Sequence, residues 1–226
     1  MKIFYFLSWL IRKIYTSTHK VNARNFSNLI LRKYLKNFGG DIINVSGWED
    51  SDKQYGYYRE YFKNSSSYTI SNIDGTNGTP VERNEKIRYL YLDLDKSLDK
   101  DLFEKFDVVF HHTVLEHVYS LFNALDIITS LSRDVIISVV PFMQPVHYTD
   151  SYSDYHRITP RFLEKYYREK GFSTILSDFN DQPFFHIYVI NISTKHPESY
   201  REAFKDAPMN FDICIYPNKW GAIKKT

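Results

Sequence analysis

"KFDVVFHHTVLEHV", residues 105–118, joins an apolar run to two histidines and then to a second, differently spaced apolar set. Val108, Val109 and Phe110 predict a buried strand, and from about His112 the spacing favours a helix. A strand that leads into a helix is the unit from which parallel sheets are built. The stretch therefore predicts one strand-helix unit of an α/β protein.

Short apolar runs and helical stretches alternate on both sides of this stretch. Further strands are predicted at 41–46, 67–74, 87–94, 133–141, 173–179 and 184–193, and helices at 24–38, 58–62 (weakly) and 159–172. This alternation predicts an α/β, doubly wound, seven-stranded and mostly parallel sheet. The last two strands are separated by a short polar link, so they are expected to form a hairpin that adds an antiparallel strand at one edge.

The length of 226 residues favours one domain with appendages. We expect an arm at 1–22, the domain at 23–195 and a C-terminal extension at 196–226. The single cysteine, Cys214, excludes an intramolecular disulfide and a multi-cysteine zinc site, which fits a reducing, cytoplasmic setting. No clustered spacing of His, Asp and Glu indicates a metal, so none is predicted.

The net charge of +2 hides an uneven distribution. Residues 1–40 contain eight basic and no acidic residues, whereas the remaining basic residues are outnumbered by the 27 acidic ones. The apolar run 3–11 is too short to span a bilayer and lacks a cleavage site. An interfacial helix that contacts anionic lipid at the inner membrane surface through residues 1–20 is one interpretation, and packing on protein is the other. No nucleic-acid partner is expected.

The stretch at 106–118 resembles the fourth-strand motif of class I S-adenosylmethionine-dependent methyltransferases, which continues as Leu-Glu-His-Val. The segment 141–172, "PFMQPVHYTDSYSDYHRITPRFLEKYYREKGF", is similar to the region after the fifth strand in the branch often found in glycan biosynthesis. The resemblance covers about residues 38–193. It implies a seven-stranded sheet with an antiparallel last strand, S-adenosylmethionine as cofactor, and a saccharide or lipid-linked glycan as methyl acceptor.

The first motif of that family, an acidic residue followed by three alternating glycines, aligns with Asn44, Ser46, Trp48 and Asp50. Ser46, with Gly47 beside it, keeps room for the methionine portion of the cofactor if Trp48 points away. The missing glycines leave a second hypothesis open, a non-catalytic protein that keeps the fold for binding or scaffolding. An RNA methyltransferase that uses the basic arm is the third hypothesis.

The resemblance also implies cofactor contacts at the ends of other strands. Asp74 closes the second strand, where a carboxylate can accept hydrogen bonds from both ribose hydroxyls, although it can equally begin a turn. Asp93 or Asp95 lies where the family's third motif approaches the adenine, although "DLDKSLDKD" at 93–101 is equally an ordinary solvated run of charges. His112 and Thr113 would border the methyl-donor pocket.

Histidines are suited to accept a proton from an acceptor hydroxyl at neutral pH. His147 is the first candidate base and His156 the second. Asp150 and Asp154 are candidates to orient a histidine or bind sugar hydroxyls, and Arg157 to bind an anionic acceptor or form a structural salt bridge.

Aromatic and acidic residues of the same region have expected roles as well. Tyr148, Tyr152 and Tyr155 are candidates for stacking on a sugar ring or for loop packing. Glu116 and His117, on the predicted helix, are expected to order the loop by hydrogen bonds.

Overall fold

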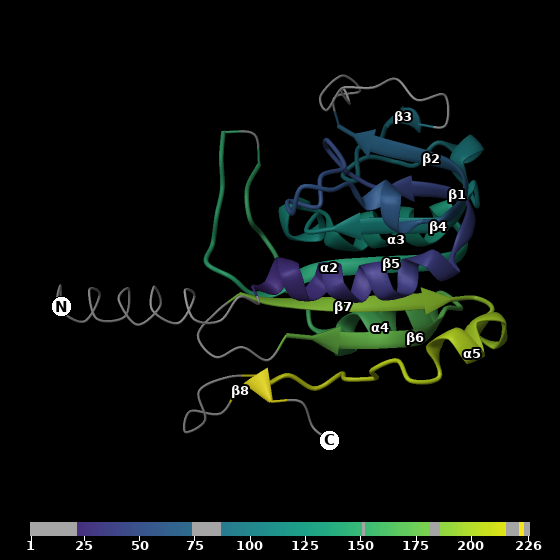
Figure 1. The fold of residues 1–226 in the computed structure, drawn as a ribbon. Coiled ribbons are helices and arrows are strands. Elements are labelled where there is room, and N and C mark those ends of the chain that lie inside the picture. Colours follow the sequence, from purple (N-terminus) through teal and green to yellow (C-terminus); the bar gives the residue numbers. More distant parts are fainter. Residues whose placement is uncertain (1–21, 74–86, 151, 181–185, 216–221, 224–226) are drawn as a thin grey trace.

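The structure is a computed structural model that describes residues 22–73, 87–150, 152–180, 186–215 and 222–223 (Figure 1). The predictions for the arm at 1–20 and for Asp74 fall outside the described residues. Among the described residues, no helix has the length and apolar character that crossing a membrane requires.

A seven-stranded sheet forms the centre of the molecule (Figure 1). Its strands are β1 (Gly39–Asn44), β2 (Asn64–Asn72), β3 (Ile87–Tyr91), β4 (Phe106–His112), β5 (Ser132–Met143), β6 (Ser173–Phe179) and β7 (Ile187–Thr194). They lie in the order β3-β2-β1-β4-β5-β7-β6, and only β7 runs antiparallel to its neighbours. The predicted fold class is confirmed, with one correction: β7 inserts between β5 and β6, so the antiparallel strand is second from the edge.

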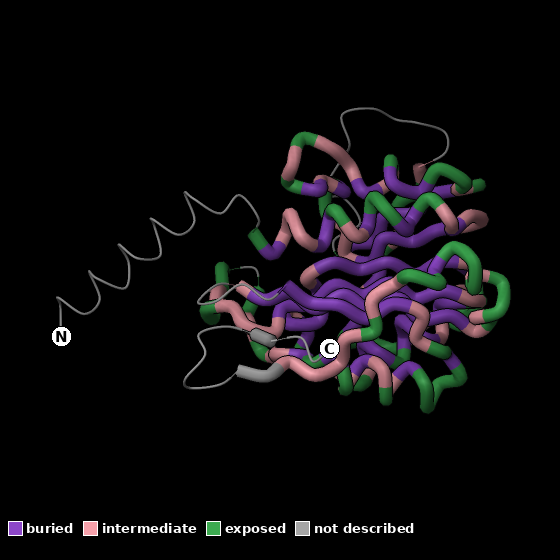
Figure 2. Tube along the Cα trace, turned by 60° about the horizontal axis from the view of Figure 1, so that its bottom comes forward, coloured by how far each residue is buried: buried purple, intermediate pink, exposed green. Residues whose placement is uncertain are grey.

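Helices cover both faces of this sheet. The α-helices are α2 (Ala23–Tyr34), α3 (Leu121–Leu131), α4 (Pro160–Glu169) and α5 (Arg201–Phe204). Short 3₁₀ helices lie at Leu35–Asn37, Tyr58–Tyr61, Lys100–Leu102, Leu115–His117 and Pro197–Tyr200, and β8 (Cys214–Ile215) pairs with β9 (Ala222–Ile223). Because side chains alternate across a strand, Val108 and Phe110 pack on the α2 side, while Val109 packs on the α3 and α4 side. Figure 2 shows the resulting buried layer along the middle strands.

Local signals place the ends of the helices. The side chain of Asn22 accepts a hydrogen bond from the backbone N–H of Asn25 at the start of α2, and Thr159 does the same for Phe162 at the start of α4. Gly171, with φ +87°, follows the end of α4. The prediction for 159–172 is therefore confirmed, whereas the predicted helix 24–38 ends as a 3₁₀ turn.

The helix expected from about His112 is wrong. β4 continues through His112, and Thr113 then has a φ of +53°, which a right-handed helix cannot include. Residues 115–117 form a single 3₁₀ turn, and α3 begins only at Leu121. The polar residues of this motif are consequently held in a loop at the end of the strand.

The chain after β7 packs back onto the domain. The ring of Phe204 lies 4.8 Å from that of Tyr34, centroid to centroid, and is buried beside Phe38. Further along, the backbone N–H of Ser177 donates to the carbonyl of Pro208, and that of Asn210 donates to the carbonyl of Ser177. This segment therefore lies along β6, at one edge of the sheet. It leaves the carboxyl ends of β1, β2 and β4 accessible.

We expect Gly40→Ala to lower the free energy of unfolding by about 3 kcal/mol. Gly40 has φ +83°, and a Cβ there would lie 2.1 Å from Oδ2 of Asp107, which accepts a hydrogen bond from the backbone of Asp41. Gly171→Ala is the matched control, because φ is +87° but no atom lies within 4 Å of the new Cβ. Chemical denaturation should show a loss of about 1 kcal/mol for the control. Equal losses in both variants would contradict the predicted clash.

Candidate functional site

The turn after β1 has an unusual backbone. Ser46, Trp48 and Asp50 have φ values of +52°, +50° and +61°, a left-handed conformation that costs about 1–2 kcal/mol for each residue other than glycine. Hydrogen bonds to β2 hold the turn: the N–H of Gly47 donates to the carbonyl of Ser71, and the N–H of Trp48 donates to Oδ1 of Asn72. Strained backbone that is held in this way is typical of functional sites.

A buried network of hydrogen bonds to Asp50 supports the turn. Oδ1 of Asp50 accepts hydrogen bonds from the amide of Asn44 (2.8 Å) and the hydroxyl of Tyr68 (2.7 Å), and Oδ2 accepts one from the backbone of Arg59. Asn44 lies so close to Gly47 that a Cβ on Gly47 would be 2.6 Å from its Nδ2. Asn44 therefore fixes the path of the turn, although it also lines a cavity.

A cavity of 540 Å³ lies between this turn and the ends of β2 and β4. Its lining includes Ser46, Trp48, Asn72, Asp93, Asp95 and Thr113. Oδ1 of Asp95 accepts a hydrogen bond from the backbone N–H of Ser120, whereas Asp93 forms a salt bridge with Lys96. The structure thus brings both aspartates predicted for the adenine to one cavity.

A second cavity of 470 Å³ adjoins the first. Its lining includes Arg24, His112, Glu116, Gln144, His147 and Tyr188. The two cavities share Ser46, Trp48, Thr113, His117, Thr149 and Tyr152. The indole of Trp48 is 53% exposed and lines both, so both volumes remain with the indole in place.

Arg24 and His112 form the inner wall of the second cavity. The guanidinium of Arg24 donates to the hydroxyl of Tyr58 (2.9 Å) and lies 3.1 Å from Nδ1 of His112. Because arginine can only donate, Nδ1 must accept, so Nε2 carries the proton and donates to Oγ of Ser27 at 3.0 Å. Burial, and then the charge of Arg24, hold the pKa of His112 well below its usual value. His112 is therefore neutral.

Arg24 itself is a partly buried cation without a carboxylate partner in an ion pair among the described residues. Its other contacts are Thr113, at 3.5 Å, and the ring of Tyr188. Thr113 has a positive φ that is rare for a β-branched residue. A cationic group and a strained threonine thus meet at the end of β4.

His147 and Asp154 lie together at the second cavity, where the backbone N–H of His147 donates to Oδ2 of Asp154. Nδ1 of His147 lies 2.9 Å from Oδ2 of Asp154, and both oxygens of that carboxylate accept hydrogen bonds from Arg157 at 2.5 and 2.6 Å. The hydrogen bonds from Arg157 lower the pKa of Asp154 to about 2. Since the carboxylate is ionised, it fixes the proton on Nδ1 and leaves Nε2 as the basic nitrogen of His147.

The expected role of Glu116 is wrong. Its carboxyl oxygens have no hydrogen-bond partner within the described part of the chain, so they do not order the loop. The backbone carbonyl of Glu116 instead accepts from the N–H of Tyr155, while the side chain of His117 does order the loop as predicted, because its Nδ1 donates to the carbonyl of Ser153. The side chain of Glu116 is left facing the 470 Å³ cavity.

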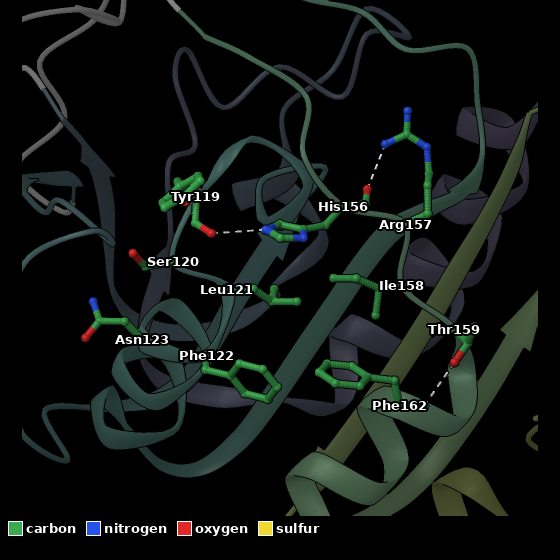
Figure 3. Close-up of a pocket in the computed structure, with 10 residues that line it drawn as sticks. All are labelled: Tyr119, Ser120, Leu121, Phe122, Asn123, His156, Arg157, Ile158, Thr159 and Phe162. Carbon is green, nitrogen blue, oxygen red and sulfur yellow. Dashed lines mark hydrogen bonds between the residues drawn. The ribbon is translucent and has the colours of Figure 1, made fainter.

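The second candidate base lies elsewhere. His156 lines a separate, mainly apolar cavity of 590 Å³ between the starts of α3 and α4, where Nε2 is 3.2 Å from the carbonyl oxygen of Tyr119 (Figure 3). Arg157 also lines this cavity. Its guanidinium forms a salt bridge with Asp154, which agrees with the structural role predicted as one of its two alternatives. Tyr148 is 77% exposed and lines none of the three cavities described.

Sequence reasoning missed Arg24, Tyr58 and Tyr188 as site residues. Arg24 was counted only among the basic residues of the first 40 positions. An arginine at the start of a helix that precedes the first strand has no sequence pattern that marks it as a site residue. It reaches His112, at the end of β4, only because α2 packs on the sheet. Among the described residues, no group of three or more His, Cys, Asp or Glu side chains could hold a metal ion.

The strand order and the cavities at the carboxyl ends together define a class. The chain has the Rossmann-like fold of the class I S-adenosylmethionine-dependent methyltransferases. No protein-family model matches the sequence, and no curated protein does either.

Solved structures with this fold have different chemistry. A Burkholderia thailandensis 1,6-didemethyltoxoflavin-N1-methyltransferase, solved with S-adenosylhomocysteine, is 18% identical, with a TM-score of 0.53 and coverage of 86% of both chains. The magnesium protoporphyrin IX methyltransferase of Synechocystis PCC 6803, also solved with S-adenosylhomocysteine, is 12% identical, with a TM-score of 0.52 and coverage of 76% of this chain and 83% of that one. The [4+2]-cyclase SpnF is 10% identical, with a TM-score of 0.55 and coverage of 76% and 81%. The likeness therefore establishes the fold, and the site must carry the function.

Proposed function

We propose that the chain is an S-adenosylmethionine-dependent methyltransferase that methylates a hydroxyl of a saccharide or lipid-linked glycan. The observation that carries the proposal is the pair of adjoining cavities at the carboxyl ends of β1, β2 and β4, with Arg24 on the inner wall. In open α/β sheets, ligands bind at this edge, where the strand order reverses.

The residues present fit the cofactor. Asp93 and Asp95 in the 540 Å³ cavity offer acceptors for the adenine amino group, and the turn at Ser46 leaves space beside β1. Arg24 in the adjoining cavity suits the carboxylate of the methionine portion. Asp74 remains a prediction for the ribose. When bound, the cofactor supplies a methyl group activated by its positively charged sulfur.

His147 supplies the base in this proposal. A sugar hydroxyl is a weak nucleophile, so a neighbouring proton acceptor is needed as the methyl group is transferred. Nε2 of His147 is basic because Asp154 holds the proton on Nδ1. Tyr152, whose ring centroid lies 6.1 Å from that of His147, offers an aromatic face for a sugar ring at the mouth of both cavities. The proposed acceptor class also rests on the resemblance of residues 141–172.

We expect His147→Gln to lower the rate of methyl transfer about 100-fold, because the acceptor proton then has no base. The measurement is incorporation of a tritiated methyl group from S-adenosylmethionine into polysaccharide and lipid-extractable fractions of bacterial membranes. His156→Gln, in the separate cavity, is the matched control and should retain the wild-type rate. A wild-type rate in His147→Gln would remove this residue from the mechanism.

The cofactor assignment has a direct test that does not need the acceptor. Titration calorimetry with S-adenosylmethionine and S-adenosylhomocysteine should give saturable heat, and both ligands should raise the melting temperature. The missing glycines at Ser46, Trp48 and Asp50 favour one alternative, a protein that keeps the fold without the chemistry. Absence of heat and of a thermal shift at millimolar ligand would support that alternative.

The arm at residues 1–20 is proposed to contact anionic membrane, because basic and large apolar residues are interleaved there. Flotation with anionic liposomes compares the full chain with a chain that lacks residues 1–20. Equal recovery of the two would contradict the membrane contact.

A further inference from the structure

Glu116 is a buried acid that the fold does not use. Its side chain is 1% exposed, and neither carboxyl oxygen has a hydrogen-bond partner within the described residues. The backbone around it is fixed, since the N–H of Tyr155 donates to its carbonyl at 2.7 Å. An unpartnered buried carboxyl group is costly, and its presence in a native fold calls for an explanation, of which a catalytic role or a bound ion is one.

The same cavity holds a partly buried cation that forms no ion pair with this acid. Arg24 lines the cavity together with Glu116, yet the ion pairs of the described residues do not join the two. The charge of Arg24 acts on Glu116 without a direct ion pair between the two groups. The cavity offers one site for an anion, at Arg24, and one for a cation, at Glu116.

The groups around Glu116 set its protonation state. Burial is the main effect that raises its pKa, its own backbone and the charges of Arg157 and Arg24 act in the lowering direction, the charge of Asp154 adds to the rise, and the net pKa is about 8. Nε2 of His117 lies 3.7 Å from Oε1, and the pKa of that histidine is lowered, mainly by burial. At pH 7 about nine-tenths of the Glu116 carboxyl groups are then protonated in the empty cavity.

We propose that Glu116 recognises positive charge in this cavity, and that it gives up its proton when a cationic group of the methyl donor binds beside it. The inference rests on the proposed function and deepens it. The O–H bond of the carboxyl group breaks, the proton passes to solvent or to Nε2 of His117, and the carboxylate pairs with the cation. S-adenosylmethionine has two cations, an ammonium and a sulfonium, and its demethylated product keeps only the ammonium.

The test is the number of protons released on binding. Calorimetric titrations of the full chain at pH 7, in two buffers of different protonation enthalpy, give this number for wild type and for Glu116→Gln. We expect wild type to release about 0.8 proton more than Glu116→Gln with S-adenosylmethionine. The affinity of Glu116→Gln should be about 10-fold lower. Extra release with S-adenosylmethionine alone assigns Glu116 to the sulfonium, and equal extra release with S-adenosylhomocysteine assigns it to the ammonium.

A second variant, His117→Gln, removes the side chain that could accept the proton of Glu116 within the protein. In His117→Gln the proton can pass only to solvent, so release must appear there even if His117 captures it in wild type. Donor binding without extra release in both the wild-type and the His117→Gln chains overturns this inference and leaves the proposed function standing. Absence of donor binding to wild type overturns both.

Denaturation of wild type and of Glu116→Gln at several pH values shows that the variant folds, and it also tests the raised pKa of Glu116. A pKa of about 8 in the folded state, above the ordinary value of 4.5, means that the folded chain holds a proton that the unfolded chain releases. The contribution of this bound proton to the free energy of unfolding is fully present below pH 4.5 and is lost as the pH rises through 8. Wild type should therefore lose stability relative to Glu116→Gln across this range. A constant difference from pH 5 to 9 would contradict the buried, protonated acid.

Discussion

Replacement of Asp50 by alanine is expected to lower the free energy of unfolding by about 3–5 kcal/mol. Asp50 is fully buried, and its carboxylate accepts hydrogen bonds from Asn44, Tyr68 and Arg59. Burial raises the pKa of Asp50, while the hydrogen bond from Tyr68 is the largest of the effects that lower it. Alanine would leave the phenol of Tyr68, the amide of Asn44 and the backbone N–H of Arg59 without their common hydrogen-bond acceptor. The guanidinium of Arg59, 3.4 Å from Oδ2 of Asp50, would also lose its partner. It would also occupy a φ of +61°, which aspartate and asparagine tolerate better than alanine.

Asp50→Asn is the control that separates the network from the backbone strain. Asparagine accepts the left-handed conformation and keeps one oxygen for Asn44 and Tyr68, so a loss of about 1–2 kcal/mol is expected. Urea denaturation monitored by fluorescence measures both variants. If alanine and asparagine cost the same, the network does not hold the turn. Affinity for S-adenosylhomocysteine should fall in parallel with stability, because the turn shapes both cavities.

The sheet was predictable from sequence because its central strands are buried on both faces. The runs rich in Val, Ile and Phe at 41–46, 106–110 and 133–141 have few alternative structures in a domain of this size, and their spacing leaves room for crossover helices. Strand ends were less predictable. β3 stops at Tyr91 rather than at Leu94, since the following residues turn back to place Asp93 and Asp95 at the cavity.

The site was only partly predictable, for two physical reasons. His147, His112 and the turn at Ser46 follow predicted strands, and the edge where parallel strands end brings such residues together. The interruption at Thr113 and the turn at Ser46 depend on left-handed backbone at residues that rarely adopt it, so no sequence rule predicts them. Arg24 acquires its place from the packing of α2, which is a property of the whole domain.

Arg24→Met is expected to weaken S-adenosylhomocysteine binding about 1,000-fold, as estimated for removal of one partner of a buried, hydrogen-bonded charge pair. The guanidinium is partly buried at the second cavity, and no carboxylate of the described residues forms an ion pair with it. The carboxylate of the ligand would then enter a cavity without its counter-charge and lose its solvation. Titration calorimetry measures the change. Lys33→Met, an exposed residue on the same helix, is the control and should bind normally.

Stability distinguishes this binding role from a structural one. A buried cation that lacks an opposite charge lowers the stability of the empty protein, and methionine fills a similar volume without that cost. We therefore expect the free energy of unfolding of Arg24→Met to equal or exceed that of wild type, although Tyr58 and His112 each lose a hydrogen bond. A structural arginine would give the opposite result, a large loss of stability with little change in affinity. Lower affinity together with higher stability is the result expected if the fold retains Arg24 for an anion that binds beside it.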